Sequence, residues 1–266
     1  MNILLHTIAL EPARWTPQRV SRPLSELLPT IAGAGFYKLE IYEPHLSLLP
    51  DESAMVGLFA QHHLVPVVLS SYLELSPHIQ PDYQFQTQVV ELLARVDRFG
   101  FGKVRLFPGR SPSPEQTETT VRQIAERLRF LAEARPGVEF LLETHDGSLA
   151  DDPACVVELV RAATAPNVGL LWQPTVFEPA AARAQWEMQG AFVRHFHLQN
   201  RTADGRFCRL ESGVISWREI LAANSFQTDV TLEFVPSGIC PVEEFDLSTS
   251  VQEAVEEFGA VVKLER

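Results

Sequence analysis

The sequence is poor in cysteine and in positive charge. Its three cysteines, Cys155, Cys208 and Cys240, are far apart and form no paired motif. This spacing supports neither a disulfide framework nor a cysteine-based zinc site, so we expect three reduced thiols. Lys and Arg number 22 against 34 Asp and Glu, which leaves a formal net charge of −12. Because nucleic-acid-binding proteins present a basic surface, this charge argues against nucleic acid as a partner.

Long apolar runs are also absent. No run approaches the roughly 18 residues that are needed to cross a bilayer, so we expect no membrane partner. The first residues lack a basic leader and become polar at Glu11, which argues against a secretory signal and predicts a cytoplasmic protein. The content of 45 % hydrophobic and 21 % charged residues is that of a globular protein.

Short β-rich segments alternate with longer amphipathic segments along the whole chain. The predicted strands are residues 2–8, 36–42, 65–71, 103–107, 138–144, 168–173, 193–199 and 230–235. The predicted helices are residues 23–34, 52–62, 83–99, 114–134, 153–163, 179–189, 217–223 and 242–258. This alternation, without a linker, predicts an α/β fold in which residues 1–266 form a single (β/α)8 TIM barrel. The alternative is a doubly wound open sheet, which usually has fewer strands and a glycine-rich first turn.

Polar residues occupy alternate positions near the carboxyl ends of several predicted strands. Glu143 and Glu233 lie at such ends, and His197 lies near the end of a third strand. Barrel enzymes keep their chemistry at these ends, and a buried carboxylate is costly unless it is paired or bound to a metal. By the same alternation, further polar side chains point inward and are expected to contact a substrate: His6, Glu40 and Arg105.

Four stretches carry a resemblance to a known family. They are residues 141–145 (LLETH), 168–174 (VGLLWQP), 195–200 (HFHLQN) and 231–234 (TLEF). In this order they resemble the strand motifs of the xylose isomerase-like barrel superfamily. That superfamily includes sugar isomerases, ketose 3-epimerases, dehydratases and relatives of AP endonucleases. The resemblance covers nearly the whole chain and implies the same barrel fold.

The resemblance also implies a cofactor, one divalent metal ion such as manganese, magnesium, cobalt or zinc. Carried over residue by residue, the ligands are Glu143, Gln173, His197 and Glu233. The family normally has Asp where this chain has Gln173. An amide oxygen coordinates a hard cation but brings no charge. The alternatives to a fully bound ion are therefore weaker binding of the ion and a site without one.

The function implied by the resemblance is isomerisation or epimerisation of a sugar or sugar phosphate. Glu143 and Glu233 would then act as the acid and base in metal-assisted proton transfer through an enediolate. Two alternatives stay open: a metal-dependent dehydratase acting on a cyclic polyol or keto acid, and a catalytically silent sugar-binding barrel in which Gln173 replaces a metal ligand. The charge of −12 and the neutral Gln173 argue against an AP endonuclease-like phosphodiesterase.

Further substrate contacts are expected in the loops that follow the strands. Arg201 lies near Arg206 and Arg209, and such a group suits a phosphate or a carboxylate. Trp15 offers an apolar wall for a sugar, and His145 a polar contact. The expected partner is a small carbohydrate. Relatives are often dimers or tetramers, so the resemblance alone suggests a homodimer or homotetramer.

Overall fold

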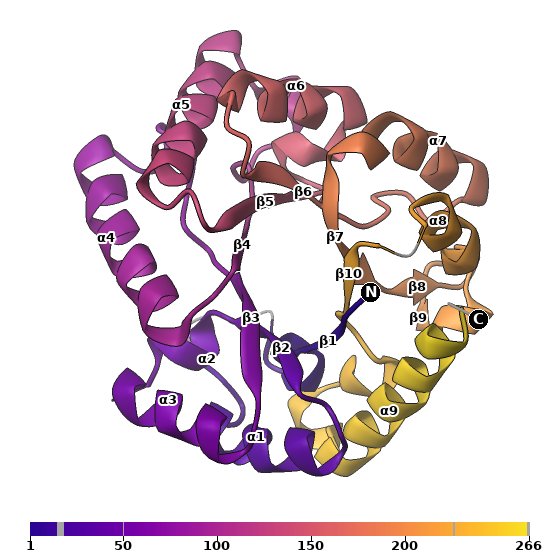
Figure 1. Cartoon of the computed structure of the whole chain (residues 1–266). Coiled ribbons are helices and arrows are strands. Elements are labelled where there is room, and N and C mark those ends of the chain that lie inside the picture. Colours follow the sequence, from indigo (N-terminus) through magenta and orange to yellow (C-terminus); the bar gives the residue numbers. More distant parts are fainter. Residues whose placement is uncertain (15–18, 50, 226, 265–266) are drawn as a thin grey trace. The chain divides into compact units, whose positions relative to one another are not determined.

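The computed structural model describes residues 1–14, 19–49, 51–225 and 227–264. Eight strands form a closed barrel in the order β1-β10-β7-β6-β5-β4-β3-β2, with helices between successive strands (Figure 1). The predicted (β/α)8 fold is therefore confirmed. The barrel strands are β1 (Ile3–His6), β2 (Lys38–Tyr42), β3 (Val65–Ser70), β4 (Lys103–Leu106), β5 (Glu139–Glu143), β6 (Val168–Trp172), β7 (Val193–Leu198) and β10 (Asp229–Leu232).

The α-helices follow the strands along the chain. They are α1 (Leu24–Gly33), α2 (Pro44–Ser47), α3 (Glu52–Gln61), α4 (Asp82–Phe99), α5 (Glu118–Ala134), α6 (Pro153–Ala163), α7 (Pro179–Gln189), α8 (Trp217–Ala223) and α9 (Leu247–Leu264). Short 3₁₀ turns lie between several of them, and a small hairpin of β8 (Asn200–Arg201) and β9 (Phe207–Cys208) follows β7.

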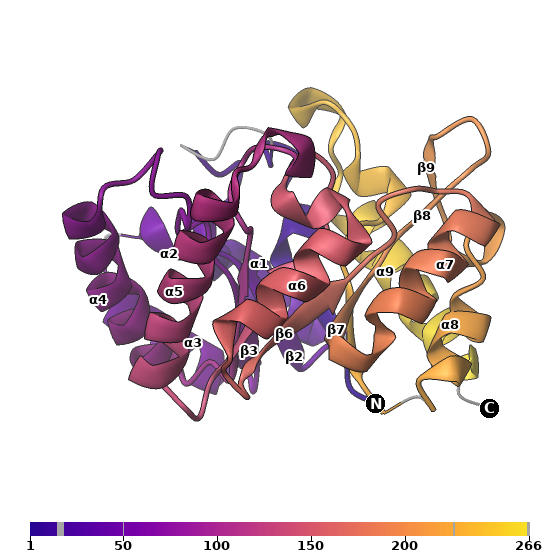
Figure 2. The same cartoon turned by 90° about the horizontal axis from the view of Figure 1, so that it is seen from above.

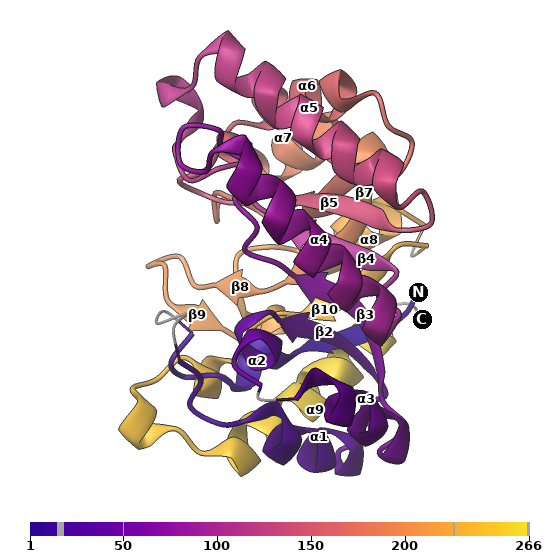
Figure 3. The same cartoon turned by 90° about the vertical axis from the view of Figure 1, so that its left-hand side faces the viewer.

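The chain divides into two compact units. The first comprises Met1–Val67, Phe177–Pro179 and His197–Arg266. Its strand β1 pairs in parallel with β10 and with β2, which brings the first and the last strand of the barrel side by side (Figure 1). Helix α9 packs on β1 and β10, and α1 lies beside α3 (Figure 3). The register places His6 of β1 opposite Glu40 of β2, so these two polar side chains are neighbours.

The second unit comprises Val68–Val176 and Ala180–Phe196. Its strands β4, β5 and β6 pair in parallel, and helices α5 and α6 lie side by side (Figure 2). Trp172 is fully buried; its Nε1 donates to Gln189 Oε1 at 2.8 Å, and its ring meets Trp186 of α7 edge to face. Trp172 therefore packs against α7. The prediction that residues 1–266 form one domain stays a prediction.

Two helices begin later than the sequence pattern predicts. Residues 113–115 form a 3₁₀ turn, and α5 begins only at Glu118, after Thr117 accepts a hydrogen bond from Thr120 N at 3.1 Å. The last helix, predicted for 242–258, spans Leu247–Leu264 because residues 242–244 form another 3₁₀ turn. In both places an acidic, proline-containing segment resembles a first helical turn, although a later capping residue starts the helix.

Other expectations concern the cysteines and the membrane. Cys155, Cys208 and Cys240 are all free and partly buried, and burial raises the pKa of each thiol. None of the helices in the described ranges is both long and apolar enough to span a membrane.

Candidate metal and proton-transfer site

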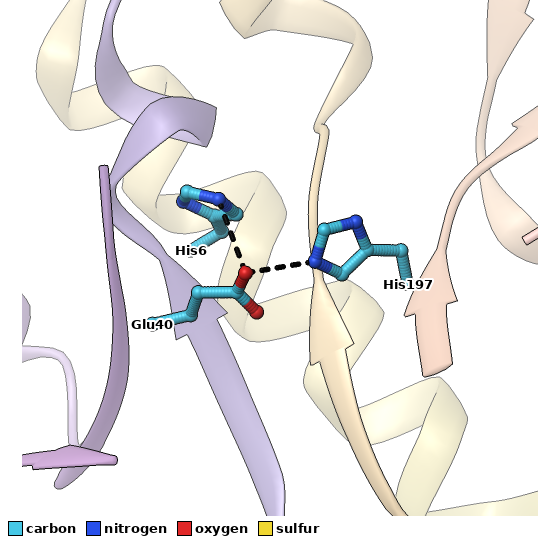
Figure 4. A group of neighbouring side chains, drawn as sticks. All are labelled: His6, Glu40 and His197. Atoms are coloured by element: carbon cyan, nitrogen blue, oxygen red, sulfur yellow. Dashed lines mark hydrogen bonds and ion pairs between the residues drawn. The ribbon is translucent and has the colours of Figure 1, made fainter. Parts of the chain in front are cut away.

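Three buried polar side chains lie together in the first unit. They are His6, the last residue of β1, Glu40 of β2 and His197 of β7, and all three are 0 % exposed. Figure 4 shows the Glu40 carboxylate reaching between the two imidazole rings. Its Oε1 lies 2.9 Å from His197 Nε2 and 3.4 Å from His6 Nε2. Glu40 therefore binds one nitrogen of each ring.

The hydrogen bonds around the two rings assign their tautomers. The backbone N–H of Ile8 donates to His6 Nδ1 at 3.1 Å, so the proton of neutral His6 is on Nε2, which faces Glu40. The short contact between His197 Nε2 and Glu40 likewise places a proton on that nitrogen. In the neutral form of His197 the lone pair is then on Nδ1. His6 and His197 each direct an N–H group at Glu40. A cation bound among these three residues would have to displace both of these protons.

Glu233 faces the other nitrogen of His197. It directly follows β10 and is 6 % exposed, and its Oε1 lies 3.4 Å from His197 Nδ1. Two acceptor atoms repel at this distance unless a proton or a cation lies between them. Ligand atoms that share one ion tetrahedrally at about 2.1 Å each are separated by about 3.4 Å. His197 and Glu233 therefore fit the two ligand positions that the family resemblance implies for them.

A glutamine orients each of the two predicted catalytic glutamates. In the first unit, Gln199 Nε2 donates to Glu233 Oε2 at 2.8 Å. In the second unit, Gln173 Nε2 donates to Glu143 Oε1 at 2.6 Å. Because amides are neutral, these bonds fix the carboxylate planes without adding a positive charge.

The second unit also holds Glu143 through Arg105. Glu143 ends β5 and is 1 % exposed, and its Oε2 forms an ion pair with Arg105 Nε at 3.0 Å. The guanidinium donates to Ser71 O at 3.2 Å and lies over the ring of Phe107 at 4.4 Å. Arg105 is thus engaged with a predicted catalytic carboxylate, and its predicted substrate contact stays a prediction.

Gln173 is positioned differently from the ligand that its place in the motif suggests. Its backbone is locked to Thr144, which donates through Oγ1 to Gln173 O at 2.6 Å and accepts from Gln173 N at 2.8 Å. Its side chain turns the amide nitrogen, a donor, toward Glu143. In this arrangement Gln173 supports Glu143. The prediction that a single ion draws ligands from Glu143 and Gln173 as well as His197 and Glu233 joins residues of both units and stays a prediction.

The remaining predicted contacts have separate positions. His145 is exposed, its Nδ1 lies 2.6 Å from Asp146 O, and its ring meets Phe107 edge to face. Trp15 lies outside the described residues. Arg201, in β8, has its guanidinium close to the rings of Phe177 and Phe207. Substrate binding by each of these residues remains a prediction.

Sequence reasoning missed how the predicted residues pair. Glu40 was assigned a substrate contact from its strand alternation, yet it binds His197, which is 157 residues away in the sequence. The role of Gln199 as a partner of Glu233 was also missed. A signal was present, because Gln199 shares the alternation of His197 and stands where the family often has lysine.

Comparisons with known proteins concern the fold and the family of the chain. The model of the xylose isomerase-like TIM barrel family matches residues 29–235. One similar structure is the probable 3-DHS dehydratase AsbF, involved in petrobactin synthesis, from Bacillus anthracis. Its identity is 18 % and its TM-score 0.72, over 95 % of this chain and 98 % of that chain.

Two further solved structures match over 100 % of this chain and 99 % of their own chains. The IolI protein with a binding zinc atom is 18 % identical with a TM-score of 0.73, and a D-psicose 3-epimerase in the presence of D-fructose is 12 % identical with a TM-score of 0.70. At such identities the likeness shows the fold. No protein with a curated description matches the sequence. The family model extends over most of the chain, and this chain therefore belongs to the xylose isomerase-like TIM barrel family.

Proposed function

We propose that this protein is an isomerase or epimerase that moves a proton next to the carbonyl group of a sugar or sugar phosphate. The observation that carries the proposal is the orientation of His197. Its Nε2 is held by Glu40, and its Nδ1 is 3.4 Å from Glu233 Oε1, which is the spacing of two ligands on one ion. The solved relatives include an epimerase and a probable dehydratase, in line with this class of chemistry.

The proposed cofactor is one divalent ion bound by His197, Glu233 and Glu143, with Gln173 as a weak fourth ligand. When bound, such an ion polarises the substrate carbonyl and stabilises negative charge on the substrate oxygens. Its identity among manganese, magnesium, cobalt and zinc is left open by this donor set of imidazole and carboxylate.

The proton transfer is assigned to the two glutamates. One carboxylate takes the proton from the carbon next to the carbonyl, and the other returns a proton. Return to the opposite face of the same carbon gives epimerisation, and return to the neighbouring carbon gives isomerisation. Gln199 on Glu233, and Gln173 with Arg105 on Glu143, hold the carboxylates in position, which lowers the cost of reaching a productive geometry.

The test is exchange of substrate C–H hydrogen with solvent deuterium. A panel of ketoses, aldoses and their phosphates is incubated in D₂O with Mn²⁺, and exchange is followed by NMR. We expect exchange with the unmodified protein and none in Glu143→Gln or Glu233→Gln. Glu126→Gln, the same change at an exposed position of α5, is the matched control and should keep full exchange. Undiminished exchange in both active-site variants would remove the paired-glutamate mechanism.

Gln173 favours a second candidate, a catalytically silent sugar-binding barrel. Its amide nitrogen faces Glu143 where the family pattern has a metal-binding carboxylate. A silent binder should be stabilised against heat by a sugar and not by Mn²⁺, Mg²⁺, Co²⁺ or Zn²⁺. A dehydratase on a cyclic polyol or keto acid would use the same residues. Its product lacks one molecule of water relative to the substrate, whereas the product of an isomerase has the same formula as the substrate.

A further inference from the structure

We propose that Arg201 binds a carboxylate group of the substrate, so that the substrate is a polyhydroxy acid such as a sugar acid or a uronic acid. The inference rests on the proposed function, because it concerns the same site. It deepens that proposal by naming the chemical class of the substrate.

Arg201 lies on the face that carries the predicted chemistry. Residues 197, 199 and 201 alternate along the chain from the end of β7 into β8. In this series His197 faces Glu233 and Gln199 donates to it. At about 3.3 Å per residue, Arg201 begins about 7 Å further along than Gln199. That position is suited to a group at the far end of a substrate whose reacting carbon lies by Glu233.

Two aromatic rings lie close to the Arg201 guanidinium. Its central carbon lies 4.7 Å from the centre of the Phe177 ring and 4.6 Å from that of Phe207. Phe207 in turn meets Phe234, the residue after Glu233, edge to face at 5.2 Å. Such cation–π contacts hold the guanidinium through its charge, and its N–H donors remain the groups that can bind an anion.

The charge of Arg201 is not neutralised by an acidic side chain of the described residues. Its Nε is buried and has no hydrogen-bond acceptor among them. The neighbouring arginines differ, since Arg206 pairs with Asp204 at 2.8 Å and Arg209 with Glu256 at 2.6 Å. The chain has 34 Asp and Glu side chains against 22 Lys and Arg side chains. An arginine that pairs with none of the described carboxylates is suited to bind an anionic group of a ligand.

The geometry favours a carboxylate over a phosphate. A guanidinium edge forms two parallel N–H···O bonds to the planar carboxylate group, whose single charge it balances. A phosphate monoester approaches two negative charges at neutral pH and has a third oxygen to satisfy. Arg206 and Arg209, the nearby candidates for a second cation, are already paired with Asp204 and Glu256.

The segment that carries Arg201 is held in place before any ligand binds. The Asn200 side chain donates to Leu210 O at 2.8 Å and to Ile215 O at 2.9 Å, and accepts from Arg201 N at 3.0 Å. Trp217 Nε1 donates to Gln199 O at 2.9 Å. A backbone fixed in this way lowers the entropy lost when the guanidinium binds.

The test compares acidic, neutral and phosphorylated sugars by isothermal titration calorimetry at constant ionic strength. The acids are D-gluconate, D-glucuronate and D-fructuronate; their neutral counterparts are D-glucitol, D-glucose and D-fructose, and the phosphates are the 6-phosphates of glucose and fructose. We expect at least one acid to bind at least tenfold more tightly than its neutral counterpart and than either phosphate. Arg201→Gln should remove that preference, and Arg201→Lys, which keeps the charge without the fork, should keep part of it. Arg206→Gln, an exposed arginine of the same hairpin, is the matched control and should bind like the unmodified protein.

Several results would overturn the inference. These are equal binding of acids and neutral sugars, a preference for the phosphates, or an acid preference that survives in Arg201→Gln while its unfolding temperature is normal. The two proposals fail separately. Deuterium exchange on neutral sugars that needs Glu143 and Glu233 keeps the proposed function even if Arg201 has no effect. Arg201-dependent acid binding without exchange in any substrate keeps the inference and removes the proposed function.

Discussion

The Glu40–His197 contact makes a quantitative prediction for metal binding. In Glu40→Gln, the side chain keeps its shape and loses its negative charge. The 2.9 Å hydrogen bond from His197 Nε2 then no longer ends on a carboxylate, and the amide must also meet the N–H of His6 at 3.4 Å. His197 is held less firmly in the tautomer that presents the Nδ1 lone pair, and this nitrogen becomes less basic.

The size of the effect follows from the bonds that change. A hydrogen bond to a charged group contributes about 1.5–3 kcal/mol, whereas a neutral one contributes about 1 kcal/mol. The difference for the short His197 bond is therefore about 0.5–2 kcal/mol, which corresponds to a loss of roughly two- to thirtyfold in affinity. Substitutions of groups that orient metal ligands typically cost about 10–100-fold, a range that overlaps this value.

The assay is a competition titration of Zn²⁺ or Mn²⁺ against a chromophoric chelator. Unmodified protein, Glu40→Gln and the surface control Glu126→Gln are compared, and thermal unfolding without metal checks that each variant is folded. Unchanged affinity in Glu40→Gln would refute the assigned role of Glu40. A loss greater than about 1,000-fold would also refute it, since removal of an orienting partner costs less than that. Such a loss would identify Glu40 as a ligand, with the His197 tautomer reversed.

Two further predictions concern the framework around the site. In Gly213→Ala the new Cβ would lie 2.0 Å from Asn200 Cγ, so we expect a loss of about 1–3 kcal/mol in unfolding free energy, measured in urea; an unchanged midpoint would show that Asn200 is not held there. For Glu11, burial by itself raises the pKa, but hydrogen bonds from His45 and Ser21 outweigh it and hold the pKa below the ordinary value of 4.5. The stabilisation by Glu11 should therefore be complete above about pH 4.5 and be lost as the pH falls through the lower folded-state pKa. The difference in unfolding free energy between the protein and Glu11→Gln should shrink below that pH, and a difference that grows on acidification would contradict the sign.

Much of the fold was predictable because its signal is local. Alternation of apolar residues placed all eight barrel strands within three residues at each end, for example β7 at Val193–Leu198 against the predicted 193–199. The errors lie at helix starts. Residues 114–117 and 241–246 have the acidic and proline composition of a first turn, yet 3₁₀ turns occupy part of both segments. Such turns differ from an α-helix by a single hydrogen-bond step, which composition does not resolve.

The sequence predicted which residues form the candidate site better than it predicted which of their atoms contact one another. The motifs named His197 and Glu233, which are neighbours in the first unit, and Glu143 and Gln173, which are neighbours in the second. The motif position of Gln173 suggested an oxygen ligand, whereas its amide nitrogen faces Glu143. Which end of an amide meets a carboxylate depends on the donors around it, and these come from other strands.

The sequence by itself determined which side chains share a face, because the period of a strand is two residues and needs no partner. It therefore aligned His197 and Gln199 from their spacing alone. Only the tertiary structure decided what each of them meets. Glu40 on His197 and Phe177 and Phe207 on Arg201 come together through strand register and loop packing between distant segments. A local pattern contains no information on that register, and it is these long-range contacts that turn polar residues at strand ends into an oriented candidate metal ligand and a candidate anion site.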